Sequence, residues 1–237
     1  MSRTYLPVGC VCAMLVVFAG SRPAHDQQSA ARPWLQSFPA DLAGLTTVGE
    51  NPYFILKPGY VLTLEGREDG QAVRLVVTVL NETKNVGGVE TRIVEERETQ
   101  GGALAEISRN YLAIERSTNN VYYFGEDVDI YKAGKVVAHE GAWLHGSNKA
   151  KFGLMMPGAP VVGLRYYQEL APGVAMDRAQ VVSLSERLTT PAGAFEKCLK
   201  TDETTPLEPG TREFKLYAPG VGLIKDGTLV LVSTAGR

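Results

Sequence analysis

The feature that most constrains the fold is a series of short turn signals that recur at regular intervals along the chain. Gly, Asn and Asp accept the positive φ angles that tight hairpin turns require. These turn signals separate segments of about ten residues, a length typical of strands joined into a hairpin series. The signals are Asp69-Gly70, Gly87-Gly88, Gly101-Gly102, Asn119-Asn120 and Ala133-Gly134, and the segments between them are residues 71–80, 89–98, 103–115 and 121–131. The spacing predicts a long antiparallel meander.

The segments themselves alternate between apolar and polar residues. In residues 71–80, one face is apolar and carries Val73, Leu75, Val77 and Val79. A period of two is typical of a strand with one face buried. The parity shifts at Val181-Val182, which indicates a bulge.

The C-terminal part repeats the pattern over residues 211–217, 221–225 and 228–232. Phe214 and Leu216 lie on one predicted face of the first strand, and Glu213 and Lys215 lie on the other. Ala218-Pro-Gly-Val221 and Asp226-Gly227 supply the turns between these strands. We predict an all-β, mainly antiparallel fold, either a half-open barrel or a two-layer sandwich, with one short N-terminal helix within residues 34–45.

The N-terminus has the pattern of an export signal. Residues 8–20 form an uninterrupted apolar run after Arg3, too short to span a bilayer and followed by small residues that suit cleavage. We expect a signal peptide at residues 1–21, a flexible tail and short helix at residues 22–45, and a single β domain at residues 46–237. We therefore expect an exported protein, periplasmic or extracellular, with no transmembrane anchor in the mature chain.

Composition excludes several classes of partner. The net charge of −2 and the scattered Lys and Arg residues show no basic patch for nucleic acid or an anionic membrane. Removal of the signal peptide would leave Cys198 as the only cysteine, so no disulfide can form within the mature chain. We expect Cys198 to be a small, buried hydrophobic residue. His139 and His145 lack the spacing of a zinc site, and no nucleophile or phosphate-loop motif is present.

Several motifs together carry a resemblance to a known group. They are Asn51-Pro-Tyr-Phe54 with Leu56-Lys-Pro-Gly59, Tyr123-Phe-Gly-Glu-Asp127, Pro191-Ala-Gly-Ala-Phe195, Pro206-Leu-Glu-Pro-Gly210, and Tyr217-Ala-Pro-Gly-Val-Gly-Leu-Ile-Lys225. Over residues 47–225 the chain resembles a widespread group of exported bacterial β-rich proteins of unassigned function. More loosely, it is similar to half-barrel envelope proteins that carry lipid or lipoprotein. The resemblance implies a bacterial source, export and one antiparallel β domain, and it assigns no site residues.

Two candidate sites follow from the residue types. Glu126, Asp127 and Asp129 form an acidic group whose hard oxygen ligands suit Ca²⁺, although the spacing is not that of an EF-hand and a solvated turn is the alternative. No other cofactor is expected. Aromatic and Met side chains suit a concave apolar face that binds a lipid-like small molecule, with an ordinary core as the alternative. These candidate ligand-binding residues are Tyr122, Phe124, Trp143, Met155, Met156 and Tyr166.

The sequence leaves three functions open. The first is an exported, non-catalytic envelope protein that binds a hydrophobic or amphipathic ligand. The second is a secreted carboxylate-dependent hydrolase, with or without Ca²⁺. Its candidate residues are Glu140, Glu169, Glu186 and Glu203 on predicted strands, although nothing selects a pair. The third is a structural or protein-interaction domain, which a filled interior would favour.

Overall fold

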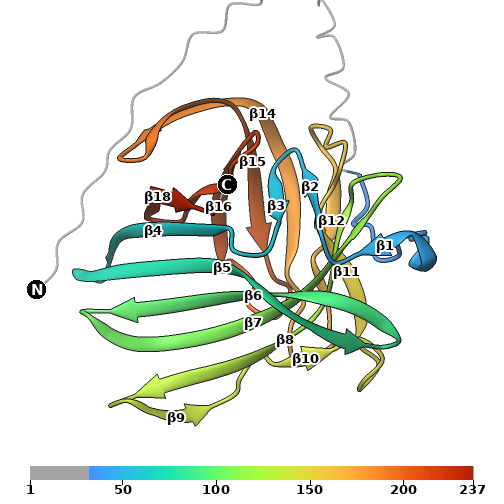
Figure 1. Cartoon of the computed structure of the whole chain (residues 1–237), viewed down its shortest axis with the longest axis horizontal. Helices are drawn as coiled ribbons and strands as arrows, with labels where there is room; N and C mark the ends of the chain where they lie inside the picture. The colour runs from blue at the N-terminus through green and yellow to red at the C-terminus, as the bar shows by residue number, and fades with distance from the viewer. Residues whose placement is uncertain (1–31, 237) are drawn as a thin grey trace, which may run out of the picture. The chain divides into compact units, whose positions relative to one another are not determined.

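The computed structural model describes residues 32–236 (Figure 1). The predicted signal peptide and residues 22–31 of the predicted tail lie outside the described residues. The described part is built almost entirely of strands. They are β1 (Leu45–Thr46), β2 (Gly49–Asn51), β3 (Phe54–Leu56), β4 (Val61–Glu68), β5 (Gln71–Val86), β6 (Val89–Gln100), β7 (Ala103–Glu115), β8 (Val121–Lys132), β9 (Lys135–Ala138), β10 (Trp143–Leu144), β11 (Lys151–Met156), β12 (Arg165–Tyr167), β13 (Glu169–Leu170), β14 (Arg178–Thr190), β15 (Gly193–Thr204), β16 (Arg212–Ala218), β17 (Gly222–Asp226) and β18 (Leu229–Ala235).

One large antiparallel sheet forms a nearly closed half-barrel. Of the two predicted architectures, the half-open barrel is therefore confirmed and the two-layer sandwich is not. Its strand order is β12-β14-β15-β16-β17-β18-β4-β5-β6-β7-β8-β11-β13. In Figure 1, β4 to β9 lie side by side, and β14 and β15 run across them. The two ends of this order, β12 and β13, are consecutive in the chain and separated only by Gln168. The sheet therefore nearly closes through one short segment.

Four of the five predicted turns of this meander have the predicted backbone geometry. Asp69-Gly70, Gly87-Gly88 and Gly101-Gly102 have positive φ at both residues and connect β4 to β7 in succession, and Ala133-Gly134 does the same between β8 and β9. Between β7 and β8, only Asn119 of the predicted Asn119-Asn120 turn has positive φ. Positive φ at both central residues is the geometry of a type I′ turn, whose twist matches that of paired strands. The bulge predicted at Val181-Val182 is confirmed, because the register of β14 against β15 shifts between Val181 and Ser183.

The predicted N-terminal helix is wrong in this fold. Within residues 34–45 there is only a three-residue 3-10 turn, η1 (Leu42–Gly44), capped by the Asp41 side chain. Pro39 fixes φ and has no N–H to donate, and Leu35 is already bonded to β12 by the bridge to Tyr166. Within residues 32–236, no helix has the length and apolar character that a membrane crossing requires.

The main apolar core joins buried residues of β3 to β8 with buried residues of β15 to β18. The predicted apolar face of β5 is confirmed, since Val73, Leu75 and Val79 are buried in this core and Val77 packs against it. A second apolar cluster contains Tyr111, Tyr122, Phe124 and Tyr166. Tyr122 and Phe124 of this cluster alternate with Tyr123 of the main core along β8, so the two clusters lie on opposite faces of that strand.

Candidate functional site

The half-barrel encloses a cavity of about 530 Å³. One part of its lining is apolar and is contributed by β3, β4, β5, β6, β7, β16, β17 and the segments beside them. These apolar lining residues are Phe54, Ile55, Tyr60, Leu62, Val77, Val79, Val94, Leu112, Tyr217, Val221 and Leu223. The volume lies in the range of small-molecule sites in proteins.

The other part of the lining is acidic. It carries one lysine, Lys215, and a group of carboxyls from β6, β7, β8, β13, β15, β17 and the neighbouring loops. These carboxyls are Glu96, Glu106, Glu126, Glu169, Asp177, Glu203, Glu208 and Asp226. The cavity is therefore amphipathic, with an excess of acidic groups.

The cavity-lining residues of β6 and β7 change from apolar to polar toward the same end of the half-barrel. On β6 the inward residues run from Val94 to Glu96, and on the antiparallel neighbour β7 they run from Leu112 through Ser108 to Glu106. Because the two strands are antiparallel, both sequences become polar toward the same end of the half-barrel. A second hollow of about 260 Å³ continues this acidic end and adds Glu68, Glu98 and Glu213 to the lining.

A bulge in β8 brings two important side chains to the same face. Tyr123 pairs with Leu112, and Glu126 pairs with Asn110, so β8 has one more residue than β7 in this interval. Residues three apart on a regular strand point to opposite faces, but the bulge at Gly125 turns both Tyr123 and Glu126 into the cavity. A Cβ at Gly125 would lie 2.4 Å from the Trp143 carbonyl oxygen, so this close approach requires glycine.

Lys215 neutralises only part of the acidic end. Its Nζ lies 3.3 Å from Asp226 Oδ2 and 3.6 Å from Glu203 Oε2. Burial disfavours the charged ammonium, but these carboxylates outweigh burial and raise the pKa of Lys215 well above its usual value. Glu203 also accepts a hydrogen bond of 2.9 Å from the Thr201 hydroxyl. Asp226 and Glu203 therefore share a single cation, Lys215.

Several carboxyls of the acidic end have raised pKa values. Desolvation and repulsion from Asp226, Glu106 and Glu98 raise the pKa of Glu96 to about 7, although Lys215 opposes the rise. Desolvation also raises the pKa of Glu126 to about 8, with Glu96, Glu106 and Asp177 adding to it, while a hydrogen bond from Tyr123 opposes it.

Glu169 has the same type of environment. Desolvation, followed by the repulsion of Glu126 and Asp177, raises the pKa of Glu169 well above its usual value. Near neutral pH the acidic end therefore holds a mixture of protonated and ionised carboxyls.

The structure places the predicted ligand-binding residues in three different surroundings. Met155 lines the cavity. Trp143 and Met156 are buried in the main core, where the Trp143 ring meets Tyr123 edge to face at 5.4 Å between centroids. The second apolar cluster contains the remaining three, namely Tyr122, Phe124 and Tyr166.

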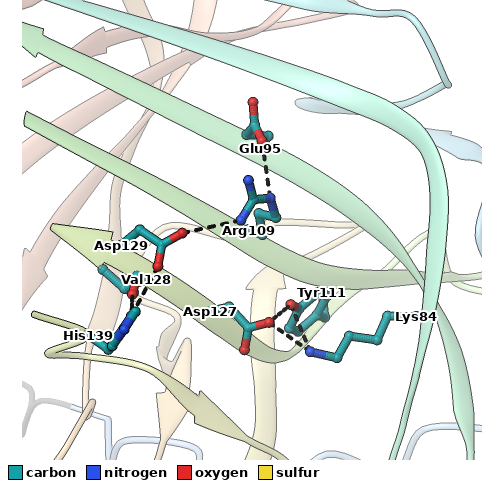
Figure 2. A network of polar contacts seen from close by, with 8 residues as sticks. All are labelled: Lys84, Glu95, Arg109, Tyr111, Asp127, Val128, Asp129 and His139. Carbon is teal, nitrogen blue, oxygen red and sulfur yellow. Dashed lines mark hydrogen bonds and ion pairs between the residues drawn. The ribbon is translucent and has the colours of Figure 1, made fainter. Parts of the chain in front are cut away.

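The predicted metal ligands do not converge. Glu126 faces the cavity, whereas Asp127 and Asp129 belong to a polar network on the opposite face of the sheet (Figure 2). No group of three or more His, Cys, Asp or Glu suited to a metal ion occurs within residues 32–236. The acidic triplet is split because neighbouring residues on a strand point to opposite sides.

Cations already pair with both aspartates of this outer network. Asp127 accepts hydrogen bonds from the Tyr111 hydroxyl and from Lys84 Nζ, the latter at 2.8 Å. Partial burial opposes ionisation of Asp127, but these two donors lower its pKa. Asp129 lies 3.5 Å from Arg109 Nη1 and 3.0 Å from His139 Nδ1. Figure 2 shows the chain of contacts continuing from Arg109 to Glu95.

Of the candidate hydrolase carboxylates, Glu169 and Glu203 line the cavity, whereas Glu140 and Glu186 do not. Cys198 is fully buried, and desolvation raises the pKa of its thiol, as expected for a small core residue. The sequence alone did not identify Glu96, Glu106 or Lys215 as site residues, because a charged residue on a strand gives no sign of whether it faces solvent or an interior.

A separate hollow of about 540 Å³ lies beside β12, β14 and β15. There the Trp34 ring is contacted by the guanidinium carbons of Arg165 and Arg178, at 4.2 and 4.5 Å from its centroid. These cation–π contacts anchor the N-terminal segment of the described chain to the sheet.

Comparisons of the chain with protein-family models, curated proteins and solved structures give no match. The function of the protein is therefore inferred from the cavity and the residues that line it.

Proposed function

We propose that this protein is an exported, non-catalytic envelope protein that binds a hydrophobic or amphipathic ligand inside the half-barrel. The observation that carries this proposal is the cavity of about 530 Å³ with an apolar inner end. Leu62, Val79 and Leu112 present aliphatic surface there, and burial of such surface against a ligand contributes roughly 25 cal/mol per Å². The apolar run at residues 8–20 supports export.

Ligand retention and rebinding test this proposal. The purified protein is delipidated, examined by native mass spectrometry before and after, and titrated with the neutral fluorescent probe N-phenyl-1-naphthylamine. Val77→Phe should fill part of the cavity and weaken probe binding, because Val77 lines it. Val137→Phe is the matched control, since Val137 is 58% exposed on β9.

Two results would count against this function. One is the absence of any retained or rebound molecule on the folded protein. The other is equal probe binding by Val77→Phe and the wild type, with circular dichroism showing that both are folded.

A secreted carboxylate-dependent hydrolase is the second candidate. It is favoured by one observation, the presence of Glu126 and Glu169 as interacting carboxyls in one cavity, with the pKa of Glu126 raised to about 8. A carboxyl that stays protonated near neutral pH can act as a general acid. Hydrolysis of a glycoside or ester panel that is lost in both Glu126→Gln and Glu169→Gln would favour this function over simple binding.

A further inference from the structure

The acidic end of the cavity has more negative groups than its own cation can balance. Lys215 pairs with Asp226 and Glu203. Within residues 32–236, no Lys, Arg or His forms an ion pair with Glu96, Glu126 or Glu169. The whole chain has a net charge of only −2, so this concentration of carboxyls is a property of the cavity.

Gln168 provides an independent sign of a missing polar partner. It is only 6% exposed, lines the cavity, and occupies the junction between β12 and β13. Its amide nitrogen is 3.8 Å from Met155 Sδ, a weak acceptor, and its amide oxygen accepts no hydrogen bond from any residue in the described range. Because Gln168 lines the cavity, this oxygen can accept a hydrogen bond from a bound molecule.

We propose that the ligand carries an ammonium group, which lies among Glu126, Glu169 and Gln168 while its apolar part lies against Leu62, Val79 and Leu112. This inference rests on the proposed function and narrows its ligand to cationic amphiphiles. Carboxylates in a poorly solvated cavity attract a cation strongly and repel an anionic lipid of the same length. The Gln168 oxygen adds a neutral acceptor at the same place.

The ionisation of these carboxyls supports the same ligand. Glu126 is faced by Tyr123 from its own strand, by Glu96 on β6, Glu106 on β7 and Glu169 on β13, and by Asp177. Lys215 on β16 opposes the rise in the pKa of Glu169 but is itself paired with Asp226 and Glu203. In the empty cavity, desolvation keeps part of these carboxyls protonated. A bound cation stabilises the carboxylate form, and the released protons pass to solvent.

Matched dodecyl probes test the inference on the delipidated protein. Dodecylammonium, dodecanol and laurate compete with N-phenyl-1-naphthylamine at concentrations below micelle formation. At about pH 8 the cation should bind at least about tenfold more tightly than laurate, a difference of about 1.4 kcal/mol. In the double variant Glu126→Gln, Glu169→Gln this preference should fall about tenfold while the affinity for dodecanol is retained.

The control is the double variant Asp127→Asn, Asp129→Asn. It removes the same number of carboxylates from the opposite face of the same part of the sheet, and it should keep the wild-type preference. The inference is overturned if the wild type does not distinguish cation from anion, or if both double variants change the preference equally. Binding of dodecanol without charge preference would leave the proposed function intact, whereas failure of every probe to bind would overturn both.

Discussion

Replacing Glu96 by glutamine should stabilise the protein, and the gain should grow with pH. Glu96 projects from β6 into the cavity, where desolvation and the carboxyls of Asp226, Glu106 and Glu98 raise its pKa from 4.5 to about 7 despite Lys215. The folded chain therefore holds this proton more tightly than the unfolded chain. The stability that the protonated group contributes is complete below about pH 4.5 and is lost as the pH rises to about 7.

The size of the loss follows from the raised pKa. A rise from 4.5 to about 7 corresponds to about 3 kcal/mol, since each tenfold change in proton affinity is worth about 1.4 kcal/mol. Glutamine has nearly the shape of a protonated carboxyl and does not ionise. Glu96→Gln should therefore match the wild type near pH 4.5 and be about 3 kcal/mol more stable near pH 8.5, which raises the Tm of a domain of this size by about 6–12 °C.

Urea unfolding at low salt, followed by circular dichroism at both pH values, measures this difference. Glu140→Gln is the control, because Glu140 is exposed in a turn and forms no ion pair or side-chain hydrogen bond with another described residue. A difference that stays constant with pH would refute the reasoning. A variant that is less stable near pH 8.5 would show that attraction to Lys215 exceeds desolvation.

Three further results are expected. The affinity for dodecylammonium should rise between about pH 6 and pH 9 in fluorescence competition. Ionisation of Glu96 and Glu126 strengthens their attraction to this cation, whose own charge changes little below about pH 9, and a flat profile would contradict this. Gly125→Ala should lower the free energy of unfolding, measured with urea, by at least about 2 kcal/mol, because the φ of 142° and the close Trp143 carbonyl oxygen leave no room for a Cβ. A decrease well under about 1 kcal/mol would show that the bulge adjusts easily. Calcium or a chelator should leave the Tm unchanged in a thermal-shift assay, since Asp127 is already paired with Lys84 on the outer face; a rise with calcium would point to a site that these contacts do not reveal.

Much of the fold could be predicted because its rules are local. Gly70 and its counterparts in the other hairpins need positive φ, and Val73 and Leu75 alternate with polar neighbours, whatever the rest of the chain does. The prediction of a short helix in residues 34–45 was wrong although the residue types suit a helix. The bridge between Leu35 and Tyr166 joins segments that are distant in the sequence, and local residue preferences do not reveal such a contact.

The candidate site was predicted only in part. Met155 and Glu126 line the cavity, but Asp127 does not, because adjacent strand residues face opposite sides. The bulge at Gly125 decides which side each residue takes, and a pattern of residue types does not locate such a bulge reliably. Tyr122 and Phe124 are on the other side of the same strand, in the second apolar cluster.

The strands, the turns and the antiparallel class could be predicted without the structure, because each depends on local φ preferences and on a period of two. That Glu96 and Lys215 face one interior follows only from the arrangement of the whole sheet. The reason is that the sheet nearly closes on itself through the segment around Gln168. Closure converts the inner face of every strand into the wall of a single space, and it thereby gathers carboxyls from distant segments at one end of an otherwise apolar cavity.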